Sequence, residues 1–374
     1  MKQYKQTCFY FINSTDIQEY TGLIIEAAKL GHSISVMVFD NMTKKRNFYY
    51  YSLAEMEEHF RSLFLLNNIS PKFVIMKYGA NDNKEYIKDY NRICPDLIFT
   101  RDVNKVKYIL WKPIMDRKKT IMFVWEAPET KVDHKSLMTI ARYNNGDINW
   151  ATNPTIVAPT KLRYASPDHA NLIDQQIIQF CSNEKTCFMA ETWSRGTSDK
   201  NDNLPMILDA IKAFKNAGYK IAWKMREKGY PAQANKTHNY VEEVSGLVDL
   251  VIKKDLNYPS SLYFLTKNCD VSCTFNVTTS ALDTMHLSPK RFVFLSKHLS
   301  AHYRDKLRPG SVSWGKLYEN LNLYVHLYDE KTQQVSIIDF ITERLSKDMD
   351  LVTIDDTDFS HKNIMQEIHR RMNW

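Results

Sequence analysis

Three consecutive hydroxyl residues, Thr278, Thr279 and Ser280, lie between an apolar segment and a predicted helix. The apolar segment, Cys269–Phe275, has the composition of a buried strand, and the helix is expected from Ser280 to His286. The free backbone N–H groups of a helix N-terminus attract anions, and hydroxyl donors beside them add to that attraction. An N-cap needs only one hydroxyl. The run therefore favours a phosphate site built without glycine.

Basic side chains follow two other predicted strands. Lys224 ends the apolar segment Lys220–Lys224, Arg226 comes two residues later, and Arg195 lies in the loop after the strand ending at Ala190. Ligands of open α/β sheets bind outside the carboxyl ends of the strands, and a planar guanidinium pairs well with phosphate oxygens. We therefore expect these three cations at the same anion site. A charged turn at Lys224 and a solvated loop arginine at Arg195 are the structural alternatives.

Carboxylates end strands in the first half of the chain. Glu126 ends the strongest strand candidate there, Thr120–Glu126, and Asp40 ends the strand beginning at Ser33. The neighbouring Trp125 would partly desolvate Glu126, and desolvation raises the pKa of a carboxyl group toward the range of a general base. We expect Glu126 as the catalytic base, with Asp40 as a weaker candidate. A capping or salt-bridging role is the alternative for Glu126.

Glycine is scarce, with ten residues in a chain of 374. Neither the dinucleotide-binding motif G-x-G-x-x-G nor the P-loop motif G-x-x-x-x-G-K-[ST] occurs. The six cysteines include no C-x-x-C pair, so reduced thiols are expected in place of a zinc site or a disulfide framework. Dehydrogenases of the Rossmann type and P-loop NTPases are therefore excluded.

The elements that must position these residues alternate between strand and helix. A strand over Thr7–Ile12, a helix over Ile17–Leu30 and a strand over Ser33–Asp40 make a βαβ unit, which predicts a parallel sheet. The alternation restarts at Lys185, after prolines at 154, 159 and 167. We expect an N-terminal domain over residues 1–152, a linker and connecting helix over 153–184, a second domain over 185–345, and a helical tail over 346–374 that packs back on the first domain.

With these segments in this order, the chain resembles a GT-B glycosyltransferase. That fold class is α/β, with two Rossmann-like doubly wound domains facing a cleft, and it is shared with UDP-N-acetylglucosamine 2-epimerases and CDP-glycerol glycerophosphotransferases. The resemblance is carried by three motifs: Ala190–Thr197, Trp223–Pro231 and Cys273–Met285. It implies an acceptor site in the N-terminal domain and a nucleotide-linked donor in the C-terminal domain.

The third motif carries the most specific implication. GT-B enzymes often hold the donor phosphates at a S-S-x-x-x-E pattern, and Asp283 takes its acidic position here, where it would accept hydrogen bonds from a ribose or sugar hydroxyl. The chain departs from the pattern in having aspartate for glutamate and Ser288–Pro289 in place of glycine–proline. In such enzymes basic side chains and a helix end neutralise the diphosphate instead of a metal ion.

The resemblance therefore implies a metal-independent glycosyltransferase that moves a sugar from a nucleotide-sugar donor to a glycan or other hydroxyl acceptor, as in polysaccharide biosynthesis. No cofactor is expected, since the donor is a co-substrate. A CDP-glycerol-type phosphotransferase and a non-catalytic glycan-binding α/β protein are the alternatives. A 2-epimerase is less favoured, because its several acidic and histidine positions are not found.

The formal net charge of +7 suits an anionic small ligand or a peripheral membrane contact, and the basic segment from Lys290 to Arg308 fits either. No dense stripe of lysine and arginine occurs, which argues against nucleic acid as a partner. No window approaches 18 apolar residues and the N-terminal apolar run is short. A cytoplasmic protein is therefore expected.

Overall fold

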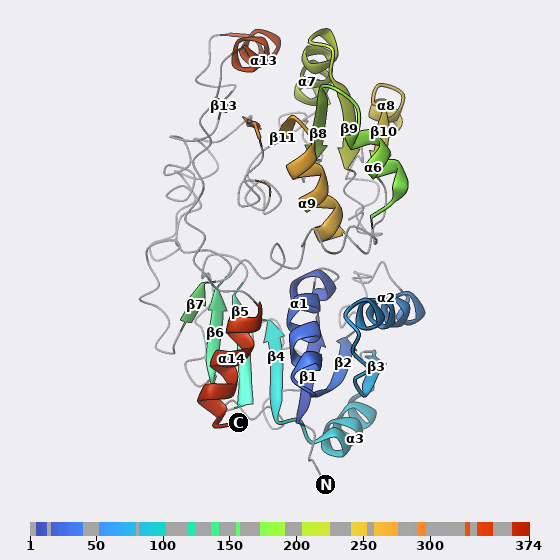
Figure 1. Cartoon of the computed structure of the whole chain (residues 1–374), viewed down its shortest axis with the longest axis vertical. Coiled ribbons are helices and arrows are strands. Elements are labelled where there is room, and N and C mark those ends of the chain that lie inside the picture. The colour runs from blue at the N-terminus through green and yellow to red at the C-terminus, as the bar shows by residue number, and fades with distance from the viewer. Residues whose placement is uncertain are drawn as a thin grey trace. The chain divides into compact units, whose positions relative to one another are not determined.

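Residue contacts divide the computed structural model of the chain into two compact units (Figure 1). Unit 1 comprises Met1–Tyr164, Gly310–Val312 and Thr357–Trp374, and unit 2 comprises Ala165–Pro309 and Ser313–Asp356. The structure describes residues 5–12, 16–39, 52–79, 82–101, 119–124, 136–141, 155–157, 173–190, 204–224, 241–252, 258–275, 284, 290–296, 326–329, 335–346 and 361–374.

Unit 1 is built on a parallel sheet. Its described strands are ordered β3-β2-β1-β4-β5-β6-β7. They are β1 (Gln6–Phe11), β2 (Ser33–Phe39), β3 (Phe73–Tyr78), β4 (Leu97–Arg101), β5 (Thr120–Val124), β6 (Met138–Ala141) and β7 (Thr155–Val157). The helices are α1 (Asp16–Lys29), α2 (Leu53–Leu66), α3 (Asn83–Ile93) and α14 (His361–Met372). The predicted parallel sheet is confirmed, and β7 falls inside the segment that was expected to connect the domains.

Unit 2 repeats this plan. Its described strands are ordered β10-β9-β8-β11-β12-β13, and every neighbouring pair is parallel. They are β8 (Thr186–Ala190), β9 (Lys220–Lys224), β10 (Leu250–Ile252), β11 (Val271–Phe275), β12 (Phe292–Ser296) and β13 (His326–Asp329). The helices are α6 (Gln175–Cys181), α7 (Leu204–Asn216), α8 (Val241–Ser245), α9 (Tyr258–Asn268) and α13 (Ile337–Leu345). Two doubly wound α/β units confirm the predicted fold class.

Local chemistry explains where the helices begin and end. Ser52 and Glu55 form a reciprocal capping box at the start of α2, in which each side chain accepts the other residue's backbone N–H. After α1 the chain turns at Gly31, whose φ of +82° lies in the left-handed region. Glycine adopts that conformation without the steric cost that a Cβ imposes. The turn brings the chain directly into β2.

Each face of the unit 2 sheet is buried by helices. Met189, Trp223 and Cys273 point to one face and join a core cluster with side chains of α7 and α13. Because side chains alternate along a strand, the residues that follow them point to the opposite face. Burial on both faces is the usual condition of a parallel sheet and accounts for its continuous apolar strands.

An aspartate fastens the start of the central strands in both units. In unit 2 the Asp270 carboxylate accepts the Thr186 backbone N–H at 2.8 Å, and the Thr186 carbonyl accepts the Asp270 N–H at 2.9 Å. In unit 1 Asp96 makes the same reciprocal pair with Gln6, at 2.9 and 2.8 Å. Each pair joins the first residue of the central strand to the residue just before the strand beside it. We call this arrangement the aspartate brace.

A third aspartate brace joins β9 to β10. Asp249 accepts the Ile221 N–H at 2.8 Å and the Lys215 ammonium at 2.9 Å, and donates its own N–H to the Ile221 carbonyl. Partial burial acts to raise the pKa of Asp249, but the hydrogen bonds from Lys215 and Ile221 outweigh it and hold that pKa below its usual value. The carboxylate is therefore ionised at neutral pH.

The last helix, α14, packs against α1 within unit 1 (Figure 1). Gly22 of α1 makes this approach possible, because a Cβ there would overlap the imidazole of His361. At the other end of α14, His369 Nε2 lies 2.8 Å from His32 Nε2, and the Lys5 ammonium lies over the Trp374 ring. Among the described residues, no helix combines the length and apolar character needed to cross a membrane.

The first prediction concerns acid. Burial, and then the nearby charge of His369, lower the pKa of His32 to about 4 in the folded chain. In the unfolded chain the pKa of His32 is about 6.5, so between pH 4 and pH 6.5 the unfolded chain binds more protons than the folded chain. Folding stability therefore falls as the pH drops through this window. Acidification from pH 7 to pH 5 should weaken α14 packing by about 2 kcal/mol. Hydrogen exchange of the α14 backbone amides at pH 7 and pH 5, corrected for the intrinsic exchange rate at each pH, measures this loss of stability.

His59→Gln is the matched control. Burial also lowers the pKa of His59 to about 4, but His59 lies on α2, where its ring meets that of Phe60 edge-on. This variant should keep the full acid response of α14, whereas His32→Gln should leave only the part contributed by His369, whose pKa is also lowered by burial. Equal protection of α14 at both pH values in the wild type would contradict the prediction.

The second prediction concerns the aspartate brace. Asp270→Ala leaves the Thr186 N–H without its acceptor and should cost about 2–3 kcal/mol of unfolding free energy. Asp270→Asn keeps an oxygen and should cost about 1 kcal/mol. Asp209, on an exposed position of α7, is the control, and Asp209→Ala should stay within about 0.5 kcal/mol. Urea unfolding measures all three, and equal values for Asp270→Ala and Asp209→Ala would refute the role of the brace.

Candidate functional site

The strand order of each unit reverses direction once, and the site follows from that reversal. In unit 2 the next two strands in sequence, β9 and β10, lie on one side of β8, and β11 lies on its other side. The switch point therefore lies between β8 and β11. Open α/β sheets bind ligands outside the carboxyl ends of the strands at such a point. The candidate site in unit 2 is therefore the edge formed by the ends of β9, β8 and β11.

Strand register places Lys224 at that edge. Lys224 pairs with Ala190, and Ala190 pairs on its other side with Thr274. Neighbouring strands lie about 4.8 Å apart, so Lys224 and Thr274 stand on the two sides of one small alanine. All three residues point away from the face that holds Trp223, Met189 and Cys273. A lysine and a hydroxyl thus share one layer at the switch point.

Lys224 is buried, with an exposed side-chain fraction of 8%. Removing an ammonium from water costs several kcal/mol unless negative charge or polar atoms compensate. For that reason, a lysine that only makes the protein surface more soluble is rarely buried. Lys224 thus places a positive charge at the carboxyl edge of a parallel sheet, the edge where open α/β sheets bind their ligands.

Thr274 adds an unsatisfied hydroxyl to the layer. It is fully buried, and its Oγ1 has no hydrogen-bond partner within the part of the chain that the structure describes. A buried polar atom in that state costs about 1–3 kcal/mol. Sequence reasoning included Thr274 in the third motif but did not select it as a site residue. Its signal was a hydroxyl residue next to the carboxyl end of β11, on the same face as the hydroxyl residue Ser272.

Of the site residues predicted from sequence, Lys224 is the one that the structure describes. The others lie outside the described residues: Arg195, Arg226, Thr278, Thr279, Ser280 and Asp283 of the predicted donor site, and Glu126 and Asp40 of the predicted acceptor site. All of them follow carboxyl ends of strands along the chain. Asp40 comes next after β2, Glu126 follows β5 by two residues, and Thr278 follows β11 by three.

Two buried carboxylates lie at the switch point of unit 1. Asp16 and Glu19 occupy the first turn of α1, directly after β1, and are 0% and 4% exposed. Asp16 accepts the Ile12 backbone N–H at 2.7 Å, which closes the turn between β1 and α1. Glu19 was missed by sequence reasoning. The available signal was its position three residues after Asp16, on the same face of the first helical turn.

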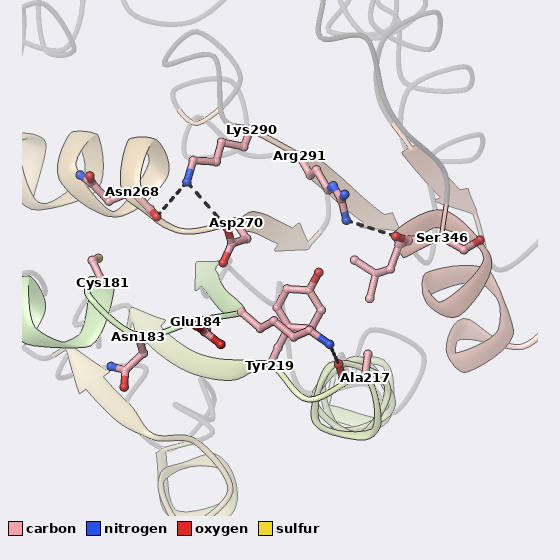
Figure 2. Close-up of a pocket in the computed structure, with 12 residues that line it drawn as sticks. Cys181, Asn183, Glu184, Ala217, Tyr219, Asn268, Asp270, Lys290, Arg291 and Ser346 are labelled. Carbon is pink, nitrogen blue, oxygen red and sulfur yellow. Dashed lines mark hydrogen bonds and ion pairs between the residues drawn. The ribbon is translucent and has the colours of Figure 1, made fainter.

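A cavity of about 870 Å³ opens at the opposite edge of the unit 2 sheet (Figure 2). Its walls include Lys185, Tyr219, Asp270 and Arg291, each of which lies just before a strand. These positions mark the amino ends of β8, β9, β11 and β12. The cavity is therefore separate from the edge that carries Lys224, and it lies away from the end where parallel sheets bind substrates.

No protein-family model matches the chain, and no curated protein matches it by sequence. Solved structures do match. UDP-GlcNAc 2-epimerase from Methanocaldococcus jannaschii aligns over 98% of this chain and 99% of its own, at 12% identity and a TM-score of 0.56. The Neisseria meningitidis UDP-GlcNAc 2-epimerase bound to UDP-GlcNAc aligns over 98% and 100%, at 10% identity and a TM-score of 0.51.

A plant protein gives a similar match. Phytolacca americana UGT2, solved with UDP-2fluoro-glucose and pterostilbene, aligns over 99% of this chain and 100% of its own, at 8% identity and a TM-score of 0.50. At such low sequence identities the matches are evidence of the fold alone. Together with the two doubly wound units, they show that the chain has the GT-B fold over nearly its whole length.

Proposed function

We propose that this protein is a nucleotide-sugar-dependent glycosyltransferase, which moves a sugar from its diphosphate leaving group to a hydroxyl acceptor. The observation that carries the proposal is the buried Lys224 at the carboxyl edge of β9, one strand from the switch point of unit 2. The GT-B fold supports it, since the solved neighbours include proteins bound to UDP-GlcNAc and UDP-2fluoro-glucose.

The donor diphosphate would lie over Ala190, where the small side chain leaves room between Lys224 and Thr274. The ammonium of Lys224 would neutralise phosphate charge, and the Thr274 hydroxyl would donate the hydrogen bond that it lacks in the described structure. The hydroxyl run Thr278–Ser280 follows β11 by three residues and would supply further donors. We include Arg195, Arg226 and Asp283 in the proposed site because they follow β8, β9 and β11 along the chain.

The chemical step needs a base on the acceptor side. Glu126 would accept the proton of the acceptor hydroxyl while the hydroxyl oxygen forms a bond to the anomeric carbon of the donor. The bond from that carbon to the diphosphate oxygen breaks, and Lys224 stabilises the negative charge that develops on the leaving group. Asp40 is the weaker candidate base. No metal ion or further cofactor takes part in this scheme.

A nucleotide-sugar 2-epimerase is the second candidate. The specific observation in its favour is the match with the M. jannaschii epimerase over 99% of that protein's length. The two functions differ in their products. A transferase releases a nucleoside diphosphate and consumes an acceptor, whereas an epimerase interconverts two nucleotide sugars without an acceptor.

The third prediction tests donor binding. In a panel of UDP-, GDP-, CMP- and ADP-linked compounds, at least one should raise the melting temperature of the protein. Lys224→Met should weaken binding of that compound about 10–100-fold, equal to about 1.4–2.8 kcal/mol, because it removes the charge and keeps the length of the side chain. Titration calorimetry measures the affinities. Thr274→Val should weaken binding about 3–10-fold, since it removes one hydrogen bond.

Lys220→Met is the matched control. Lys220 begins the same strand, points to the same face and hydrogen-bonds Asn183 at the amino edge, away from the proposed site. Its affinity for the donor should equal that of the wild type. Absence of a thermal shift with every compound at millimolar concentration would sink the proposal, and equal losses in the Lys220 and Lys224 variants would remove Lys224 from the site.

The fourth prediction tests the base. Glu126→Gln should lower the turnover rate about 10²–10⁴-fold and change donor affinity less than threefold, because the amide cannot accept the proton. Product analysis of the wild type distinguishes the reactions: a nucleoside diphosphate indicates a transferase, CMP released from CDP-glycerol a phosphotransferase, and an epimeric nucleotide sugar an epimerase. Wild-type turnover in Glu126→Gln would contradict its assignment as base.

A further inference from the structure

Two cysteines from distant parts of the chain meet beneath the cavity of Figure 2. Cys181 is the last residue of α6, and Cys269 follows the end of α9. Their Sγ atoms lie 3.8 Å apart, although the residues are 88 positions apart in the sequence. A disulfide requires about 2.05 Å, so the two sulfurs must approach by less than 2 Å to form one.

The two sulfurs differ in access to solvent. Cys181 is half-buried and lines the cavity of about 870 Å³, where Figure 2 shows its side chain near the end of α6. Cys269 is 1% exposed. A small oxidant in the cavity can therefore reach Cys181 first. The remaining cysteines lack this combination: Cys8, Cys187 and Cys273 are buried, and Cys94 is exposed on unit 1.

The surroundings of the pair favour a thiolate on Cys181. A hydrogen bond from the Cys269 thiol lowers the pKa of Cys181, the positive charge of Lys290 lowers it further, and partial burial opposes both. The same hydrogen bond and burial raise the pKa of Cys269 well above its usual value. The Lys290 ammonium lies 3.7 Å from Asp270 and 3.5 Å from the Asn268 carbonyl, beside Cys269 in sequence (Figure 2).

We propose that Cys181 and Cys269 form a modification site, a dithiol that a hydroperoxide oxidises to an intramolecular disulfide. The Cys181 thiolate attacks one peroxide oxygen, so that the S–O bond forms, the O–O bond breaks, and hydroxide leaves and takes up a proton to form water. The sulfur becomes a sulfenic acid. The Cys269 sulfur then attacks it, the S–S bond forms, and the hydroxyl group departs with the Cys269 proton as a second water.

The disulfide would tie together the ends of α6 and α9. It would close a loop across 88 positions of sequence, which restricts the unfolded chain and raises the melting temperature of unit 2. It would also fix Cys269 next to Asp270, the residue of the aspartate brace that fastens β11 to β8. Oxidation therefore acts on the stability of the sheet that carries Lys224.

The test uses the full chain, reduced and then treated with hydrogen peroxide. Peptide mass spectrometry should find the Cys181 and Cys269 peptides joined with the loss of two hydrogen atoms, and the oxidised protein should melt at a higher temperature. Cys181→Ser should abolish the cross-link and the shift. Lys290→Met should slow cross-linking about 3–10-fold, because it removes the charge that favours the thiolate.

Cys94→Ser is the control, since it removes an exposed cysteine on unit 1 and should leave the cross-link intact. The proposal does not depend on a Cys269 variant, whose buried side chain affects folding. Separate alkylation of Cys181 and Cys269 after peroxide treatment of the wild type would overturn the proposal. A cross-link from Cys181 to any other cysteine would overturn it as well.

Discussion

The aspartate brace sets the geometry on which both sheets depend. Parallel strands are joined by long crossovers, so no tight turn fixes the alignment of β1 with β4 or of β8 with β11. Asp96 and Asp270 supply that alignment, since each binds the backbone of its neighbouring strand through both its carboxylate and its own N–H. A shift of one residue would point the side chains of a strand to the opposite face. The Asp270 brace thus keeps Thr274 beside Ala190, at the far end of the strands.

The chemistry of the candidate site is concentrated at the opposite edge from the brace. At the amino edge, charges are paired within the protein, as in Asp249 with Lys215 and Asp270 with Lys290. At the carboxyl edge, Lys224, Asp16 and Glu19 are buried charged residues, and the predicted site residues follow the ends of strands along the chain. One edge therefore serves stability and the other is suited to ligand chemistry, a division that parallel sheets favour.

Much of this fold could be predicted from the sequence because its strongest signals are local. The apolar run before Asn13, the capping residues of α1 and the glycine at 31 define the first βαβ unit without any knowledge of tertiary contacts. β6 was not predicted, because Met138–Ala141 is a short segment with no clear apolar run. Lys224 could be selected because it ends an apolar strand. The sequence signal for Glu19 was only its spacing from Asp16, and its burial is visible only in the folded chain.

Helix α14 gives unit 1 a particular order of events during synthesis. Residues 165–356, which hold all of unit 2, are made between the first part of unit 1 and helix α14. At about 5–20 residues per second this interval lasts roughly 10–40 seconds. Throughout it, the α1 surface around Gly22 and His32 lacks the helix that later covers it. Within residues 1–374, unit 1 therefore begins to leave the ribosome before unit 2 and is completed after it.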